Sequence, residues 1–228
     1  MTTTVTAPAS TAERQTPRTT ARGWAFAGIG AGIAGIGSMV GSSMAGAVYD
    51  PAVAGDAVGV TAKLAEQTPQ IMLFHTATMI SAVLLVVFAT GLRRRLTAAV
   101  GPESLLPGVA ASGLLLVAAV QILGSGLTTE FVFGVADPDL IVPETAVLFG
   151  HWIGTIPWLW GTAGLAALAV AVVSLRHRAL PRWLGVTSLV LGGLATLFAI
   201  SPLQYMAGMV GPIWLTVAAI GFTTARGR

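Results

Sequence analysis

Six apolar stretches, each about the length that a bilayer requires of a spanning helix, constrain the fold of this chain more than any other feature. They cover residues 23–48, 71–92, 107–128, 145–175, 183–200 and 204–222. Only 9% of the residues are charged, against about a quarter in soluble domains. The sequence therefore predicts an all-α fold, a polytopic membrane bundle of six transmembrane helices.

The charged residues predict how this bundle is oriented. If the N-terminus is cytoplasmic, all eleven arginines fall on the cytoplasmic side, whereas Lys63 and seven of the nine acidic residues fall outside. This distribution obeys the positive-inside rule at every loop. We therefore expect cytoplasmic N- and C-termini, with residues 1–22 as a disordered tail and residues 223–228 as a short second tail.

The same arginines account for the basic isoelectric point of about 10.2. The arginines lie at the ends of apolar stretches and are not interleaved with aromatic residues in a soluble domain, so a nucleic-acid partner is not expected. The expected partner is the lipid bilayer, and the oligomeric state is left open.

The first span has a second interpretation. Residues 45–48 read AGAV, a pattern that a signal peptidase could cleave after Ala47 and that would leave five spans. Against cleavage, the apolar run is longer than a signal core, and it carries the pairs Gly28/Gly32 and Gly37/Gly41. Small residues at this spacing let two helices approach closely, so we expect close contacts there.

The stretch LFGHWIGTIPWLWG at 148–161 is unexpectedly polar and aromatic for a membrane span. His151, Thr155, Trp158 and Thr162 share one helix face by spacing, and Pro157 predicts a kink. Other spans also carry polar residues in their outer halves. We therefore predict an outward-opening aromatic pocket for a small hydrophobic molecule, formed by His75, Gln121, His151, Thr155, Trp158, Trp160, Tyr205 and Trp214. The alternative is that these groups only hold helices together.

The outer loop 49–70 also allows two interpretations. Val53, Ala57, Val60 and Leu64 recur at helical spacing, which favours a short helix lying on the outer surface. A partly ordered loop is the alternative.

Three functions are compatible with such a pocket. The first is a binding, accessory or transport bundle for a neutral hydrophobic molecule, since no charged residue lies deep in a span. The second is an enzyme that acts on a lipid or isoprenoid, in the manner of acid-initiated terpene cyclases. In that case Glu130, Asp50 or Glu144 would be the acid, and aromatic rings would stabilise a carbocation.

The third function is a haem or quinone site with His75 and His151 as axial ligands from two spans. No further cofactor is expected. The absence of cysteine excludes disulfides and thiolate metal sites, and no third ligand for zinc has a usable spacing. Walker, GxSxG and HExxH motifs are also absent, which removes the common hydrolytic classes.

Residues 23–222 resemble a bacterial family known as domain of unknown function 4386. The features that carry the resemblance are the helix-loop-helix start, the run GLRRRL at 91–96 and the stretch LPRWLGVTSLVLGG, of which LPRWLG at 180–185 is the most specific part. The resemblance implies about six helices in a bacterial cytoplasmic membrane. It implies no activity and no functional residues.

Overall fold

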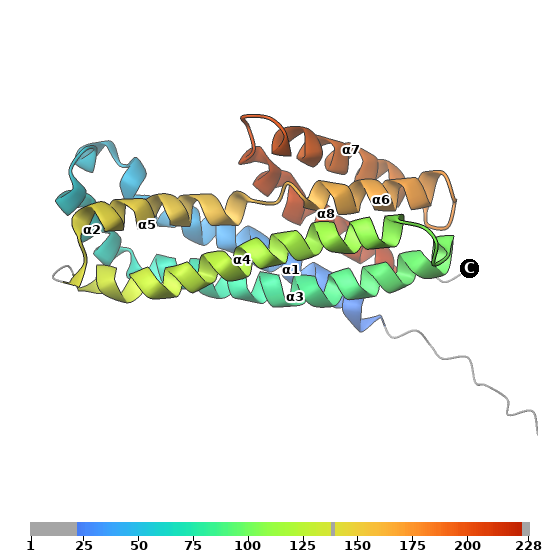
Figure 1. The fold of residues 1–228 in the computed structure, drawn as a ribbon, viewed down its shortest axis with the longest axis horizontal. Helices are drawn as coiled ribbons and strands as arrows, with labels where there is room; N and C mark the ends of the chain where they lie inside the picture. Colours follow the sequence, from blue (N-terminus) through green and yellow to red (C-terminus); the bar gives the residue numbers. More distant parts are fainter. Residues whose placement is uncertain (1–21, 138–139, 225–228) are drawn as a thin grey trace, which may run out of the picture.

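The chain forms an elongated bundle of helices in the computed structural model (Figure 1), which describes residues 22–137 and 140–224. Within these ranges there is no strand, and six helices are long and apolar enough to cross a membrane. The all-helical fold and the six apolar helices of spanning length are thus confirmed, while membrane insertion and the orientation of the termini stay predictions. Most of the predicted N-terminal tail and residues 225–228 of the C-terminal tail lie outside the described ranges.

The spans begin within three residues of the predicted positions, but α3 and α4 each continue eight residues beyond the predicted ends at 92 and 128, and the fourth span is interrupted. They are α1 (Gly23–Met44), α3 (Thr68–Val100), α4 (Leu106–Ala136), the pair α5 (Pro143–Thr155) and α6 (Ala163–Leu175), α7 (Arg182–Ala199) and α8 (Met206–Thr224). The helix α3 continues past the apolar stretch through its three arginines and stops only at Gly101, whose φ of +87° favours glycine.

A short helix covers one end of the bundle, which we call the α2 end. Two 3₁₀ turns, η1 (Ala47–Tyr49) and η2 (Pro51–Val53), lead from α1 into α2 (Ala57–Glu66). The Asp56 carboxylate caps α2 by accepting a hydrogen bond from the Val58 amide. Val60 and Leu64 are buried against the bundle, so the helical interpretation of this loop is confirmed.

The opposite end, which we call the terminal end, holds the start of α1, the end of α8 and the loop 176–181 (Figure 1). There the Arg22 guanidinium donates to the Thr223 carbonyl at 2.8 Å, which joins the start of α1 to the end of α8. The bundle interior has two apolar clusters. One surrounds Phe88 and Trp214 toward the terminal end, and the other surrounds Phe74 and Phe149 toward the α2 end.

The helices differ in length, and this difference shapes the surface. With 33 residues α3 is about 50 Å long, whereas α7 with 18 residues is about 27 Å long. Figure 1 shows α7 and α8 beside α6, with α5 extending beyond them toward the α2 end. The short α7–α8 hairpin therefore leaves part of α5 and the end of α1 uncovered.

The fourth span is interrupted at the polar stretch. After α5 ends at Thr155, the 3₁₀ turn η4 (Ile156–Trp158) and an irregular segment lead to α6. Pro157 lies in this interruption, where a kink is predicted, because proline lacks the amide that would continue the helix. The interruption changes the helical register, so Trp160 turns into the core and packs against Gly35 and Gly211.

Candidate functional site

A pocket of about 600 Å³ lies beside the α7–α8 turn, where the short α7–α8 hairpin leaves part of α5 and the end of α1 uncovered. Its wall comes from the end of α1 and the turn that follows, from α5 and η4, and from the α7–α8 turn. The lining residues are Ser42, Ser43, Gly46, Tyr49, His151, Gly154, Trp158, Tyr205 and Met206. Three of the eight residues predicted to form a pocket, His151, Trp158 and Tyr205, are thus brought together in one wall.

Two glycines of α5 allow the turn η1 to lie close against this helix, where it forms one side of the pocket wall. A Cβ on Gly154 would come within 2.5 Å of the Tyr49 hydroxyl oxygen, and a Cβ on Gly150 would overlap Val48. These two positions therefore form a groove in α5 in which η1 lies. The Tyr49 ring meets the His151 ring edge-on, with centroids 5.6 Å apart and an interplanar angle of 80°, an arrangement that aromatic pairs favour.

Hydrogen bonds hold α1 against α5 beneath the pocket. The Ser42 hydroxyl donates to the Ile153 carbonyl at 2.8 Å, and the Ser43 hydroxyl donates to Met39 of its own helix at 2.9 Å. Both serines thus use their donors within the protein. The contact from Ser42 shows that the polar residues of α1 join helices, as the alternative interpretation of the polar stripe expects.

Thr155, also predicted for the pocket, lies beside the wall but outside its lining. Its hydroxyl donates to the His151 carbonyl at 2.7 Å and lies 3.5 Å from the Tyr205 hydroxyl, which is a long contact. The Tyr49 hydroxyl and the His151 ring have no hydrogen-bond partner within the described part of the chain. The pocket thus offers phenol and imidazole groups at the edges of aromatic rings.

None of the residues that line the pocket is Asp, Glu, Lys or Arg, so the wall contains no carboxylate, ammonium or guanidinium group. Partial burial raises the pKa of the Tyr49 phenol above its ordinary value of 10.0, and the neighbouring Tyr205 raises it further. Tyr49 is therefore a neutral hydroxyl at physiological pH, able to donate to a carbonyl or to accept from an alcohol.

The remaining residues predicted for the pocket lie outside its lining. Gln121 is buried on α4 and its Oε1 has no partner in the described structure, while half-buried His75 on α3 has a buried and unpartnered Nδ1. Trp160 and Trp214 are fully buried in the core. The Trp214 indole donates to the Ser188 hydroxyl at 3.0 Å, which is a structural contact between α8 and α7.

The three carboxylic acids predicted for an enzymatic reaction are likewise absent from the lining. Asp50 follows Tyr49 directly, but its carboxylate pairs with Lys63 and accepts a hydrogen bond from the Ala52 amide. Glu130 on α4 and Glu144 in the first turn of α5 are exposed. The geometry therefore places no carboxyl group in the pocket wall.

The two histidines predicted as haem ligands lie on different helices, and α1 contacts both of these helices. Ser38 of α1 shares a 2.6 Å hydrogen bond with Thr78 of α3, whereas Ser42 reaches α5. His151 lines the pocket and His75 does not. Within the described residues, no group of three or more His, Cys, Asp or Glu side chains could hold a metal ion.

Six residues of the lining are not among those predicted from the sequence: Ser42, Ser43, Gly46, Tyr49, Gly154 and Met206. Gly154 and Met206 lie next to the predicted residues Thr155 and Tyr205, whereas the four from α1 and the turn after it have no predicted pocket residue near them in the sequence. No known family model, curated protein or solved structure matches this chain. The resemblance to domain of unknown function 4386 therefore stays a prediction, and the site rests on its geometry.

Proposed function

We propose that this chain is a multi-pass protein of the bacterial cytoplasmic membrane that binds a small, neutral, hydrophobic molecule in the pocket between α1, α5 and the α7–α8 turn. The observation that carries the proposal is an uncharged wall of aromatic rings with unpartnered polar tips. Such a wall excludes charged ligands, because burying an unpaired charge is costly. It suits a molecule that is mostly apolar and has one hydroxyl or carbonyl group.

The pocket opens outward in this proposal. The arginines of the described residues lie at the terminal end of the bundle, at the start of α1, near the end of α3, in the loop 176–181 and at the start of α7. The positive-inside rule puts that end in the cytoplasm. The pocket is bounded by the outer end of α1 and by the turn between α7 and α8, so it lies near the outer surface of the membrane. A hydrophobic molecule could then enter from the outer leaflet or from the outside.

Binding or transport is favoured over acid-initiated chemistry. A cyclase of that type needs a carboxylic acid beside the alkene or epoxide that it protonates, and the three candidate acids lie outside the wall. The volume of about 600 Å³ falls within the range of about 300–1,000 Å³ that is typical of small-molecule sites. A fifteen-carbon isoprenoid alcohol such as farnesol is about the right size for a first probe.

Cysteine accessibility tests this proposal directly, because the chain has no cysteine of its own. The variants His151→Cys and Trp158→Cys should react with a membrane-impermeant thiol reagent added from outside, since the thiolate forms in water. Farnesol should slow the reaction, whereas farnesyl phosphate should do so far less because its charge has no partner in the wall.

Ala166→Cys is the matched control, because Ala166 is fully buried in α6 and its thiol should stay unreactive. If His151→Cys and Trp158→Cys are as unreactive as this control while Gly55→Cys labels normally, there is no outward pocket. If both label but no neutral hydrophobic molecule protects them, the pocket is present but the proposed ligand class is wrong.

A further inference from the structure

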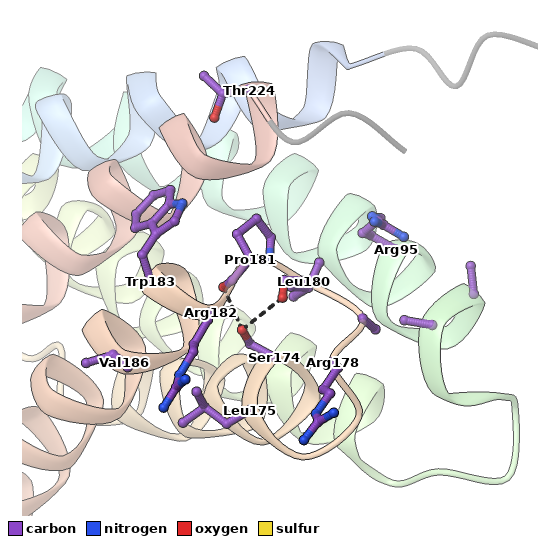
Figure 2. Close-up of a pocket in the computed structure, with 13 residues that line it drawn as sticks. Arg95, Ser174, Leu175, Arg178, Leu180, Pro181, Arg182, Trp183, Val186 and Thr224 are labelled. Atoms are coloured by element: carbon purple, nitrogen blue, oxygen red, sulfur yellow. Dashed lines mark hydrogen bonds between the residues drawn. The ribbon is translucent and has the colours of Figure 1, made fainter. Parts of the chain in front are cut away.

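A second and larger cavity, of about 1500 Å³, lies at the terminal end of the bundle. It is formed by the end of α3, the loop between α6 and α7, and the first turns of α7 (Figure 2). Three arginines line it: Arg95 from α3, Arg178 from the loop and Arg182 from the first turn of α7. These three are among the eleven arginines that predict the orientation of the bundle.

The three positive charges have no counter-charge in the cavity. The lining includes no Asp or Glu, and the ion pair between Lys63 and Asp50 lies at the other end of the bundle. Figure 2 shows Arg178 on the loop and Arg182 on α7 extending in the same general direction, while Arg95 lies apart from them on α3. Guanidinium groups prefer the planar oxygen pairs of phosphate and carboxylate, so an anion would be stabilised here.

The loop that carries Arg178 is held in one conformation. The buried Ser174 hydroxyl lies 2.7 Å from the Pro181 carbonyl and 3.3 Å from the Leu180 carbonyl, and donates to them (Figure 2). Gly185 of α7 leaves room for that serine, because a Cβ there would come within 2.5 Å of the Ser174 oxygen. Arg178 itself has a φ of +52°, a backbone conformation that residues with a Cβ rarely adopt.

An apolar track leaves the cavity along α7. Val186 lines the cavity and is 47% exposed, and Val190 and Leu197 continue on the same helix face with exposures of 60% and 58%. Gly193 lies between them with no atom near the place of a Cβ. Trp183, which is 48% exposed, stands beside the start of this track. A ligand with a charged head and an apolar chain fits both parts.

We infer that this cavity binds the phosphate headgroup of an anionic glycerophospholipid, with an acyl chain lying along the exposed face of α7. The three arginines supply the charge, and the cytoplasmic side of a membrane supplies anionic lipid at the level where basic pockets between helices bind it. The inference rests on membrane insertion but is independent of the outward pocket, which shares no residue with this cavity.

Lipid binding by the purified full chain in mild detergent tests the inference. Native mass spectrometry should show that wild-type protein retains phosphatidylglycerol much better than phosphatidylcholine, whose headgroup is zwitterionic. The triple variant Arg95→Gln, Arg178→Gln, Arg182→Gln should bind phosphatidylglycerol about 100-fold more weakly, if each arginine contributes about 1 kcal/mol.

The matched control is the triple variant Arg93→Gln, Arg94→Gln, Arg176→Gln. It removes the same charge from the same end of the bundle, but at exposed positions outside the cavity lining, and it should bind phosphatidylglycerol like the wild type. If the first triple variant does not fold, Arg178→Gln alone should still weaken binding by about fivefold.

Three outcomes would overturn the inference. Equal weakening in the control variant would mean that diffuse positive charge attracts the lipid. Equal retention of phosphatidylcholine would mean that the headgroup is not recognised. Displacement of the lipid by millimolar inorganic phosphate or glycerol phosphate would mean that the cavity takes a soluble anion.

Discussion

Gly41 of α1 lies directly against the backbone of Phe74 in α3, and a Cβ at position 41 would come within 2.9 Å of the Phe74 amide nitrogen. Gly37 lies one turn earlier on the same helix, and a Cβ there would meet only the Ala77 methyl group at 3.8 Å. The sequence predicts a close contact at both glycines, and the structure has it at Gly41 alone. Gly28 and Gly32 do approach neighbouring helices closely, at Phe88 and Thr216.

The two glycines therefore predict opposite effects of the same substitution. Gly41→Ala should lower the free energy of unfolding by about 1–3 kcal/mol, because the new methyl group must push α1 away from the α3 backbone. Gly37→Ala should be neutral or stabilising by up to about 1 kcal/mol, because alanine favours a helix and the space is free. Thermal unfolding of both variants in detergent gives the comparison, and equal loss of stability in both would contradict it.

The six spans are predictable because each depends on local composition. A run of apolar residues long enough to cross a bilayer has few alternatives to a helix, and its ends are marked by charge, proline or glycine. Asp56 and Gly101 show how such signals work, one by capping α2 and the other by ending α3. The ends of α3 and α4 are predicted less well, because both helices continue past the apolar run, to Val100 and Ala136, and no strong helix breaker follows directly after residue 92 or 128.

The pocket is only partly predictable, because its wall depends on how helices end relative to one another. The spacing of His151 and Trp158 indicates a shared face, but that reasoning assumes an unbroken helix. The interruption after Trp158 turns Trp160 into the core. Likewise, the arginine cavity depends on the conformation of the loop 176–181, which Ser174 stabilises by a hydrogen bond to the Pro181 carbonyl. No periodicity in the sequence predicts this loop conformation.

The two buried tryptophans offer a matched pair for testing this account of the core. Trp160 and Trp214 are both fully buried, yet the Trp160 indole nitrogen has no partner in the described structure while that of Trp214 donates to Ser188. Trp160→Phe removes a buried N–H group that makes no hydrogen bond. Trp214→Phe removes the donor of a buried hydrogen bond and leaves the Ser188 hydroxyl without this partner.

We therefore expect Trp214→Phe to destabilise the protein by about 1–3 kcal/mol more than Trp160→Phe, because an unpaired buried polar group is costly. Trp160→Ala should cost about 3–5 kcal/mol through the cavity that it leaves. Chemical unfolding in detergent measures all three variants. The account of the core is wrong if Trp160→Phe proves to be the more damaging of the two phenylalanine variants.

The orientation of the bundle is the third prediction. Reporter fusions after Arg95 and Arg178 should be active in the cytoplasm, because the arginine-rich ends stay inside. A fusion after Gly55, in the exposed connection before α2, should report the periplasm. A periplasmic signal from the Arg95 fusion would mean that the bundle has the opposite orientation in the membrane. The aromatic pocket would then lie on the cytoplasmic side.

The fourth prediction uses the two tyrosines, Tyr49 and Tyr205, which are the only ones in the chain. Burial raises the pKa of Tyr49 above 10.0, so the folded protein keeps this phenol neutral where the unfolded chain would ionise it. The stability linked to Tyr49 is therefore complete below pH 10 and is lost as the pH rises through the raised pKa. An ultraviolet titration of phenolate absorbance should show the ionisation of Tyr49 as a step above pH 10, and Tyr49→Phe should remove this step.

A ligand in the pocket should move the same step further. Farnesol would exclude water from the Tyr49 hydroxyl, and the added desolvation should raise the pKa again. Tyr205→Phe provides the control, because it removes the secondary cause of the shift and leaves burial, so the Tyr49 step should fall but stay above its ordinary value. If farnesol leaves the Tyr49 step in place while it protects a cysteine at position 151, the ligand occupies the pocket without contacting this hydroxyl. The polar tip of the wall would then have to be the His151 ring.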